Sequence, residues 1–388
     1  MNPTTILVKF HETALKGRNR HIFINRILDN LRVATKDLPV KNIWHKRLII
    51  GLSLHEEAKI PEIAKRITNC FGIAKFYPVY EVEKNLESTL NLLKEILEQT
   101  KFDTFRITAK RPSKNFNLTS DEINRKVGTF VEEFTNSKVQ LKNPDLEIFI
   151  EVMDNNIFIH TEEFKGFGGM PVGVSGRAMA LMSGGIDSPV AIWQMLKRGT
   201  TVDMLHFHSY PLVDKSSIEK AFDLAKILNQ HQYNSKLFLA PLSKIQQKII
   251  VEVPPEYRVL LYRRFMIRIA EKLAIHKKSI ALITGESLAQ VASQTLENIA
   301  AIDAAVKMPI LRPLIGTNKD EIIEHSKRIG TFDISIRPDQ DCCSLFVPKH
   351  PITAAKAEIL ESFENSLPMK EMIESSIEQT TEEKFIYP

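Results

Sequence analysis

Apolar and polar positions in the second half of the chain predict strands that alternate with helices. Short apolar runs have the length of strands, and between them apolar residues recur every three to four positions, as on one face of a helix. The predicted strands are residues 177–182, 202–207, 236–239 and 280–284, and the predicted helices include residues 217–229, 257–275 and 319–329. This alternation indicates a parallel sheet covered by helices on both faces, with ligands at the carboxyl ends of its strands.

The first half of the chain is patterned as two small α+β units. Residues 1–75 follow the order strand, helix, strand, strand, helix, which is typical of a ferredoxin-like domain; the predicted elements are 5–10, 22–33, 43–44, 48–52 and 60–67. Residues 76–165 form the second unit; its predicted elements are strands 76–81 and 104–109, helix 86–97, a helix from Asp121 capped by Ser120, and a hairpin of 146–153 and 157–161.

Five glycines lie among residues 166–176, just before the predicted α/β domain at residues 177–388. Their spacing superficially resembles a dinucleotide-binding fingerprint, but Pro171 intervenes and no helix follows. We interpret the segment as a linker into that domain, with a flap beside the site as the alternative.

A loop of small and polar residues, SGGIDS at residues 183–188, follows the first strand of the α/β domain. Two glycines let backbone N–H groups approach an anion, the serine hydroxyls add donors, and the dipole of the following helix favours negative charge. Pro189 is expected at the first helical position, and Gly199 ends the helix. The sequence predicts a phosphate site here, with an ordinary strand-to-helix turn as the alternative. No G-x-x-x-x-G-K-[ST] motif occurs, so the common P-loop is excluded.

The composition is that of a globular protein with two or three domains, since 43% of its 388 residues are hydrophobic and 26% charged. No apolar run is long enough to cross a membrane, and the N-terminus lacks a secretory pattern. Three cysteines, two of them adjacent, cannot build a disulfide framework. We therefore expect a cytoplasmic location and no membrane association.

Charge is distributed unevenly along the chain. Residues 1–48 carry ten Lys/Arg and three Asp/Glu (net +7), residues 101–128 seven and three (+4), and residues 355–388 three and eight (−5). A basic front half favours a polyanionic partner, with ordinary solvated helix faces as the alternative. The candidate RNA-binding residues are Lys110, Arg111 and Lys114, which lie close to an aromatic residue and a proline bend.

Two further features concern the predicted strand ends and helix starts. His206 and His208 share one face of a strand; a metal pair is conceivable, but buried strand histidines are more common, and we predict no metal ligands. Lys319 opens a helix, where a cation is unfavourable unless an anion is nearby, so it is a candidate for a phosphate-facing role, with a surface lysine as the alternative.

Eight stretches, in order along almost the whole chain, resemble the tRNA 4-thiouridine synthetase family (ThiI, tRNA uracil 4-sulfurtransferase). They are FHETALKGRNR (10–20), FGIAKFYPV (71–79), KRPSKNF (110–116), GFGGMPVGVSG (166–176), LMSGGIDSPVA (181–191), HFHS (206–209), TGESLAQVASQT (284–295) and DCCSLF (341–346). The resemblance implies a ferredoxin-like domain, a THUMP RNA-binding domain and an α/β PP-loop ATP pyrophosphatase domain of the adenine nucleotide alpha hydrolase-like kind. Many members add a C-terminal rhodanese domain, for which this chain leaves no room, and a role in thiamine biosynthesis is left open.

The family's nucleotide contacts, carried over position by position, imply ATP and Mg²⁺ as cofactors. The implied contacts are Leu181, Met182, Ser183, Gly184, Gly185, Asp187, Ser188, His206, Phe207, Arg263, Gly285 and Gln294. Asp187 and Lys319 are the implied catalytic residues at the phosphates. An exposed surface arginine is the alternative for Arg263.

A sulfur-transferring enzyme also needs an accessible cysteine that forms a thiolate readily. The resemblance assigns the persulfide to Cys342, while its neighbour Cys343 stays open as the carrier or as the thiol that resolves the persulfide. Two buried small residues are the alternative for this pair. Cys70, beside an apolar stretch, is expected in the core.

The implied reaction is thiolation of uridine 8 in tRNA. Its O4 attacks ATP, pyrophosphate leaves, and persulfide sulfur then expels AMP. The implied partners are tRNA and a cysteine desulfurase or another persulfide donor, and a homodimer is left open. The alternatives are a PP-loop ligase that adenylates a small carboxylate and a non-enzymatic tRNA-binding protein.

Overall fold

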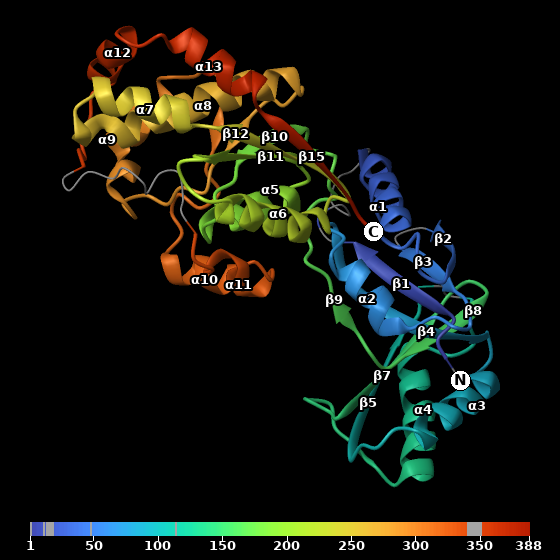
Figure 1. Cartoon of the computed structure of the whole chain (residues 1–388). Coiled ribbons are helices and arrows are strands. Elements are labelled where there is room, and N and C mark those ends of the chain that lie inside the picture. The colour runs from blue at the N-terminus through green and yellow to red at the C-terminus, as the bar shows by residue number, and fades with distance from the viewer. Residues whose placement is uncertain (1, 11, 13–18, 47–48, 113–114, 340–350) are drawn as a thin grey trace. The chain divides into compact units, whose positions relative to one another are not determined.

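The computed structural model describes residues 2–10, 12, 19–46, 49–112, 115–339 and 351–388. The chain folds into two compact units, residues 1–169 and 170–388, each with its own sheet (Figure 1). The division lies inside the glycine-rich stretch that the sequence predicts to be a linker.

The first unit contains a nine-stranded sheet in the order β2-β3-β1-β4-β8-β7-β5-β6, with β9 paired to β4. Its elements are β1 (Thr5–Phe10), α1 (Arg20–Ala34), β2 (Val40–Lys46), β3 (Ile49–Leu54), α2 (Ile60–Thr68), β4 (Ile73–Glu83), α3 (Leu86–Glu98), β5 (Thr104–Lys110), α4 (Ser120–Thr135), β6 (Lys138–Val139), β7 (Leu146–Val152), β8 (Asn156–His160) and β9 (Phe164–Lys165). The predicted strand and helix order of both α+β units is confirmed.

One long strand, β4, joins these two α+β patterns. Its residues up to Val79 pair with β1, and those from Tyr80 onward pair with β8. The proposed domain boundary at residue 75/76 therefore falls within a continuous strand, which a sequence pattern read domain by domain does not reveal.

The cap of α4 differs from the prediction by one residue. Thr119, not Ser120, is the N-cap: its hydroxyl accepts from the Glu122 N–H at 3.2 Å, and the Glu122 carboxylate accepts from the Thr119 N–H at 2.7 Å. This reciprocal pair is a capping box, which satisfies two helix-end donors where a cap at Ser120 would satisfy one.

The second unit contains a six-stranded sheet in the order β14-β13-β10-β11-β12-β15. Its strands are β10 (Arg177–Leu181), β11 (Thr201–His208), β12 (Asn234–Pro241), β13 (Leu282–Ile283), β14 (Ile310–Leu311) and β15 (Thr381–Ile386). All neighbouring pairs are parallel except β12 with β15. The predicted parallel sheet is confirmed, and the antiparallel edge strand β15 is an element that the sequence reading did not identify.

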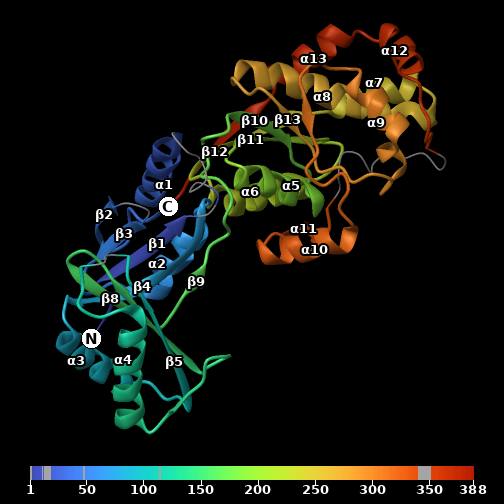
Figure 2. The same ribbon diagram turned by 180° about the vertical axis from the view of Figure 1, so that it is seen from behind.

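Helices cover both faces of this sheet, as Figures 1 and 2 show from opposite sides. They are α5 (Asp187–Lys197), α6 (Ser216–Asn229), α7 (Ser243–Glu252), η3 (Pro255–Tyr257), α8 (Arg258–His276), η4 (Ala292–Gln294), α9 (Leu296–Asp303), α10 (Lys319–Arg328), α11 (Phe332–Ser335), α12 (Ala357–Asn365) and α13 (Met369–Glu378). α5 and α6 pack on one face, and α8, flanked by α7, α9 and α13, packs on the other.

The sequence predicts where α5 begins and ends, and the structure tests both positions. The helix begins at Asp187, so Pro189 is its third residue, not its first. Gly199 ends it with a φ of 88°, as predicted. Gly173 and Ser175 donate backbone hydrogen bonds to the Gly199 carbonyl at this end, about 16 Å along the helix axis from the loop. The alternative of a flap beside the site is therefore wrong for residues 170–176.

Candidate nucleotide-binding site

The SGGIDS loop connects β10 to α5 at the carboxyl edge of the parallel sheet. Ser188 Oγ donates to the Ser183 carbonyl oxygen (3.1 Å) and accepts from the Ser183 N–H (3.0 Å), while the Gly185 N–H donates to Ser183 Oγ (3.2 Å). Ser188 is buried, so its hydroxyl fixes the shape of the loop. These three hydrogen bonds close the loop on itself.

The N-terminus of α5 is open to an anion. Its N-cap, Ile186, supplies no side-chain hydrogen bond, so the first-turn N–H groups are not capped by that residue. Such a helix end carries about half a positive charge and favours phosphate.

Gly285, which follows β13, packs directly against the start of this helix. A Cβ atom on Gly285 would lie 2.7 Å from both the N and the Cα of Ser188. Only glycine therefore allows this close approach of the two segments.

The Asp187 carboxylate is held by two side chains from distant parts of the sequence. Lys319 Nζ lies 2.6 Å from Asp187 Oδ1, and Gln290 Nε2 donates to Asp187 Oδ2 at 3.1 Å. Lys319 is the first residue of α10, as predicted. A lysine at a helix start was expected to have an anion nearby, and the Asp187 carboxylate is one such anion.

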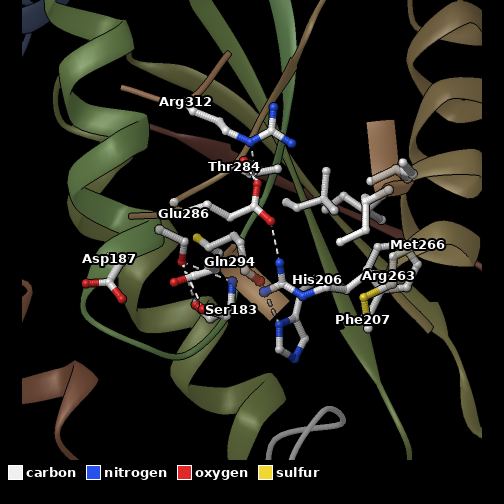
Figure 3. Close-up of a pocket in the computed structure, with 17 residues that line it drawn as sticks. Ser183, Asp187, His206, Phe207, Arg263, Met266, Thr284, Glu286, Gln294 and Arg312 are labelled. Atoms are coloured by element: carbon white, nitrogen blue, oxygen red, sulfur yellow. Dashed lines mark hydrogen bonds and ion pairs between the residues drawn. The ribbon is translucent and has the colours of Figure 1, made fainter. Parts of the chain in front are cut away.

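A pocket beside the loop brings most of the predicted nucleotide contacts together (Figure 3). Ten of the twelve line it; they are Leu181, Met182, Ser183, Asp187, Ser188, His206, Phe207, Arg263, Gly285 and Gln294. Gly184 and Gly185 lie in the loop but not on the pocket wall. Apolar side chains such as Phe207 and Met266 line another part of the wall, which suits a flat aromatic base.

His206 lies within β11. The ring is buried, with Nδ1 2.9 Å from the Met182 carbonyl oxygen and Nε2 3.3 Å from Ser217 Oγ. These contacts fit the interpretation as a buried strand histidine. Burial lowers the pKa of the neighbouring His208 to about 4, with His206 adding to the shift.

Sequence reasoning missed a buried charge network at the pocket. Glu286 pairs with Arg263 and with Arg312, whose Nε lies 2.6 Å from Glu286 Oε2. Arg312 also pairs with Asp303, and Thr284 Oγ1 donates to Glu286 at 2.9 Å. Burial alone would raise the pKa of Glu286, but the two guanidinium groups outweigh it and hold that pKa below its usual value. In the sequence, the only indication of a role for Glu286 was that the TGES segment directly follows a predicted strand. Nothing in the sequence indicated a role for Arg312.

The network also resolves the alternative for Arg263. Its side chain is 24% exposed, lines the pocket and is oriented by Glu286, so it is not a free surface arginine. Figure 3 shows the contact between its guanidinium group and the Glu286 carboxylate as a dashed line.

The candidate RNA-binding residues have different surroundings. Lys110 is exposed at the end of β5. Arg111 Nη1 donates to the carbonyl oxygens of Phe116 (2.8 Å) and Leu118 (2.6 Å), so this side chain holds the following loop. Lys114 lies outside the described residues.

Of the three cysteines, only Cys70 belongs to the described residues. Cys342 and Cys343, the predicted thiols, lie outside the described residues. Cys70 is buried and its thiol donates to the Arg66 carbonyl oxygen, which confirms the prediction that it belongs to the core.

Comparison with known proteins covers almost the whole chain. Three family descriptions match it: "ThiI ferredoxin-like domain" at residues 5–77, "THUMP domain" at 83–162 and "Thiamine biosynthesis protein (ThiI)" at 173–369. A probable tRNA sulfurtransferase of Thermus thermophilus is 44% identical, and the match covers 99% of this chain and 95% of that protein. The chain belongs to the ThiI family.

Other ThiI relatives agree. A probable tRNA sulfurtransferase of Coxiella burnetii is 43% identical over 96% of this chain and 97% of that protein. A solved structure titled as a 4-thiouridine synthetase–RNA complex with bound ATP has a TM-score of 0.90 and 34% identity, covering 99% of this chain and all of that one. The predicted family and fold are confirmed. Of the helices described, none combines the length and hydrophobicity needed to span a bilayer.

Proposed function

We propose that this chain is an ATP-dependent tRNA sulfurtransferase that converts uridine 8 of tRNA to 4-thiouridine. The observation that carries the proposal is the closed SGGIDS loop at the uncapped N-terminus of α5, beside a pocket lined by ten predicted nucleotide contacts. Membership of the ThiI family supplies the substrate class.

The two parts of the pocket match the two parts of ATP. Phe207, Met182 and Met266 offer apolar surface to the base. The loop N–H groups, the helix dipole and Lys319 supply positive potential for the phosphates. Binding ATP in this orientation puts its α phosphorus between the two parts, open to attack by a nucleophile.

The residues present also fit Mg²⁺. That ion binds proteins through one or two carboxylates and completes its octahedron with water and phosphate oxygens. Asp187, at the edge of the loop and 22% exposed, is the carboxylate that would bind it, through a lone pair that its contacts with Lys319 and Gln290 leave unused. When bound, Mg²⁺ neutralises charge on the leaving pyrophosphate.

Adenylation comes first, and sulfur transfer then takes two displacements. The uracil O4 attacks the α phosphorus, pyrophosphate leaves, and the N3 proton is released. The terminal persulfide sulfur forms a bond to C4 as the C4–O bond to AMP breaks. A second thiol loses its proton and attacks the cysteine sulfur of the remaining S–S bond. The base leaves as 4-thiouridine with a proton again on N3, and the protein is left with a disulfide that a thiol reductant must reduce.

Asp339 is the last described residue before the two cysteines. Asp339 lies beside the loop, because its Oδ2 would be 2.7 Å from a Cβ atom on Gly184. Cys342 follows it by three positions, a length of chain that spans at most about 11 Å. The proposal takes Cys342, which the family resemblance implies, as the persulfide carrier, with Cys343 as the alternative.

The basic first unit would bind tRNA through phosphates and shape, with Lys110 and Lys114 among its contacts. The uridine must leave its stack to reach the pocket. The proposal includes a cytoplasmic location and a sulfur donor, which is a cysteine desulfurase or another persulfide source. It leaves the formation of a homodimer open.

Nucleoside mass spectrometry tests the proposal. Unmodified tRNA is incubated with the protein, Mg-ATP, cysteine and a cysteine desulfurase, and with Cys342→Ser and Cys343→Ser variants. We expect ATP-dependent 4-thiouridine, lost in Cys342→Ser while tRNA-dependent pyrophosphate release continues. Pyrophosphate release with small carboxylates and without tRNA would favour a ligase. Binding of tRNA with no AMP and no thiouridine would favour a binding protein.

A further inference from the structure

Lys220 is a buried lysine that the chemistry above does not use. It lies on α6 behind the SGGIDS loop, is 4% exposed, and its Cδ would be 2.8 Å from a Cβ atom on Gly184. Its ammonium is 3.0 Å from Asp339 Oδ1 and donates to the Ser335 carbonyl oxygen at 3.1 Å. A buried ammonium is costly unless it is paired, so these partners hold it in place.

The stretch from Ser335 to Asp339 is docked by two more contacts. Ser335 Oγ donates to the Gly185 carbonyl oxygen at 3.3 Å, and Arg337 pairs with Asp223 of α6 at 2.7 Å. Among these anchoring side chains, Lys220 alone contacts both Ser335 and Asp339, the two ends of the stretch. It also packs against Gly184 of the SGGIDS loop.

A second anchor holds the chain after residue 350. Asn298, fully buried in α9, donates through Nδ2 to the carbonyl oxygens of Ile352 (2.9 Å) and Ala292 (2.7 Å). Its Oδ1 accepts from the Ala355 N–H at 3.0 Å. Ala292 belongs to η4, which ends at Gln294 on the pocket wall.

Residues 340–350, which lie outside the described part of the chain, connect these anchors in the sequence and contain Cys342 and Cys343. We propose that Lys220 and Asn298 are positioning residues for sulfur transfer, because they fix the chain on either side of the cysteines to the loop and to the pocket wall. Positioning raises the effective concentration of the thiol at the activated base. The inference rests on the proposed function and concerns its second step alone.

The experiment measures pyrophosphate and 4-thiouridine in the same reaction for Lys220→Met. This change removes the ammonium but keeps the methylene packing on Gly184. We expect 4-thiouridine formation to fall about tenfold to a hundredfold, the range that misplacement of a reacting group costs, while pyrophosphate release stays within about twofold. Asp339→Asn must change the ratio of the two products in the same direction. Asn298→Ala also removes a hydrogen bond to η4 at the pocket wall, so it must lower 4-thiouridine formation more than pyrophosphate release. Lys226→Met, an exposed lysine on the same helix, should match the unmutated protein.

A purely structural role for Lys220 predicts a different result. If both products fall together in Lys220→Met, or if Asp339→Asn and Asn298→Ala keep the original ratio, the proposal is overturned. If Lys220→Met fails to fold, as judged by its melting curve, the ratio in the other two variants decides. If the unmutated protein releases pyrophosphate with tRNA yet makes no 4-thiouridine, the proposed function itself fails, and this inference fails with it.

Discussion

Lys319 Nζ and Asp187 Oδ1 lie 2.6 Å apart although 132 positions separate the two residues. Each side chain lies in the first turn of a helix, Asp187 in α5 and Lys319 in α10. The helix dipole favours the aspartate there and disfavours the lysine. The pair offsets that disadvantage, and it holds a cation beside the loop proposed to bind phosphate.

Replacement of Lys319 by methionine should impair adenylation. We expect the tRNA-dependent rate of pyrophosphate release to fall about a hundredfold or more, because a preorganised cation at the developing charge is lost. Lys327→Met, on the same helix and away from Asp187, is the matched control. A Lys319→Met variant that keeps the full rate would exclude this lysine from the phosphate chemistry.

Gly285→Ala should damage the site through packing alone. The added methyl group would meet backbone atoms of Ser188 at 2.7 Å, and backbone cannot rotate away. We expect a loss of about 1–3 kcal/mol in unfolding free energy and weaker ATP binding, measured by denaturant titration and calorimetry. Gly316→Ala, where a Cβ atom would meet nothing within 4 Å, should leave both unchanged. Equal behaviour of the two variants would contradict the contact.

The buried pair of Arg264 and Glu364 should anchor α12 to α8. Arg264 is fully buried, and its Nε lies 2.7 Å from Glu364 Oε1. Glu364→Ala leaves a buried guanidinium with a lost partner, so we expect a loss of about 3–5 kcal/mol in unfolding free energy. Glu361→Ala, whose carboxylate is 49% exposed and 3.7 Å from Arg264, should cost less than about 1 kcal/mol.

The same pair has a defined pH dependence. Burial would raise the pKa of Glu364, but Arg264 and Arg268 outweigh burial and hold it below its usual value. A carboxyl with a depressed folded pKa stabilises the protein above its unfolded pKa of about 4.3, and the contribution disappears as the pH falls through the lower folded value. Unfolding free energy should therefore drop below about pH 4, and Glu364→Ala should show a smaller drop. Identical acid profiles would refute this role.

Replacement of Lys110 and replacement of Arg111 should have different effects on tRNA binding and on stability. Lys110→Glu removes an exposed cation, so we expect weaker tRNA binding, a salt slope smaller by about one, and unchanged stability and ATP binding. Arg111→Ala should also lower thermal stability, because Arg111 holds two carbonyl groups of its loop. Lys356→Glu, an exposed lysine in the acidic C-terminal region, serves as the control. Unchanged affinity of Lys110→Glu at moderate salt would contradict the assignment.

The sequence by itself determined the local chemistry of this protein. Apolar periodicity located β10, α5 and α8, because burial on one face leaves a regular pattern. The glycines and serines of SGGIDS predicted a phosphate loop, because small residues let an anion approach the backbone N–H groups at a helix start. Lys319 was identifiable because a cation is out of place where it stands.

Only the tertiary structure decided which distant residues meet. Glu286 and Arg312 look like ordinary charged residues until folding buries them together, and Lys220 looks like a surface lysine of α6 until Asp339 packs on it. The cap of α4 lies one residue earlier than predicted, at Thr119, because competing caps differ by a single hydrogen bond. The start of α5 lies two residues earlier than predicted, at Asp187. Pairing between residues a hundred positions apart depends on the register and packing of whole elements, and no local pattern encodes that.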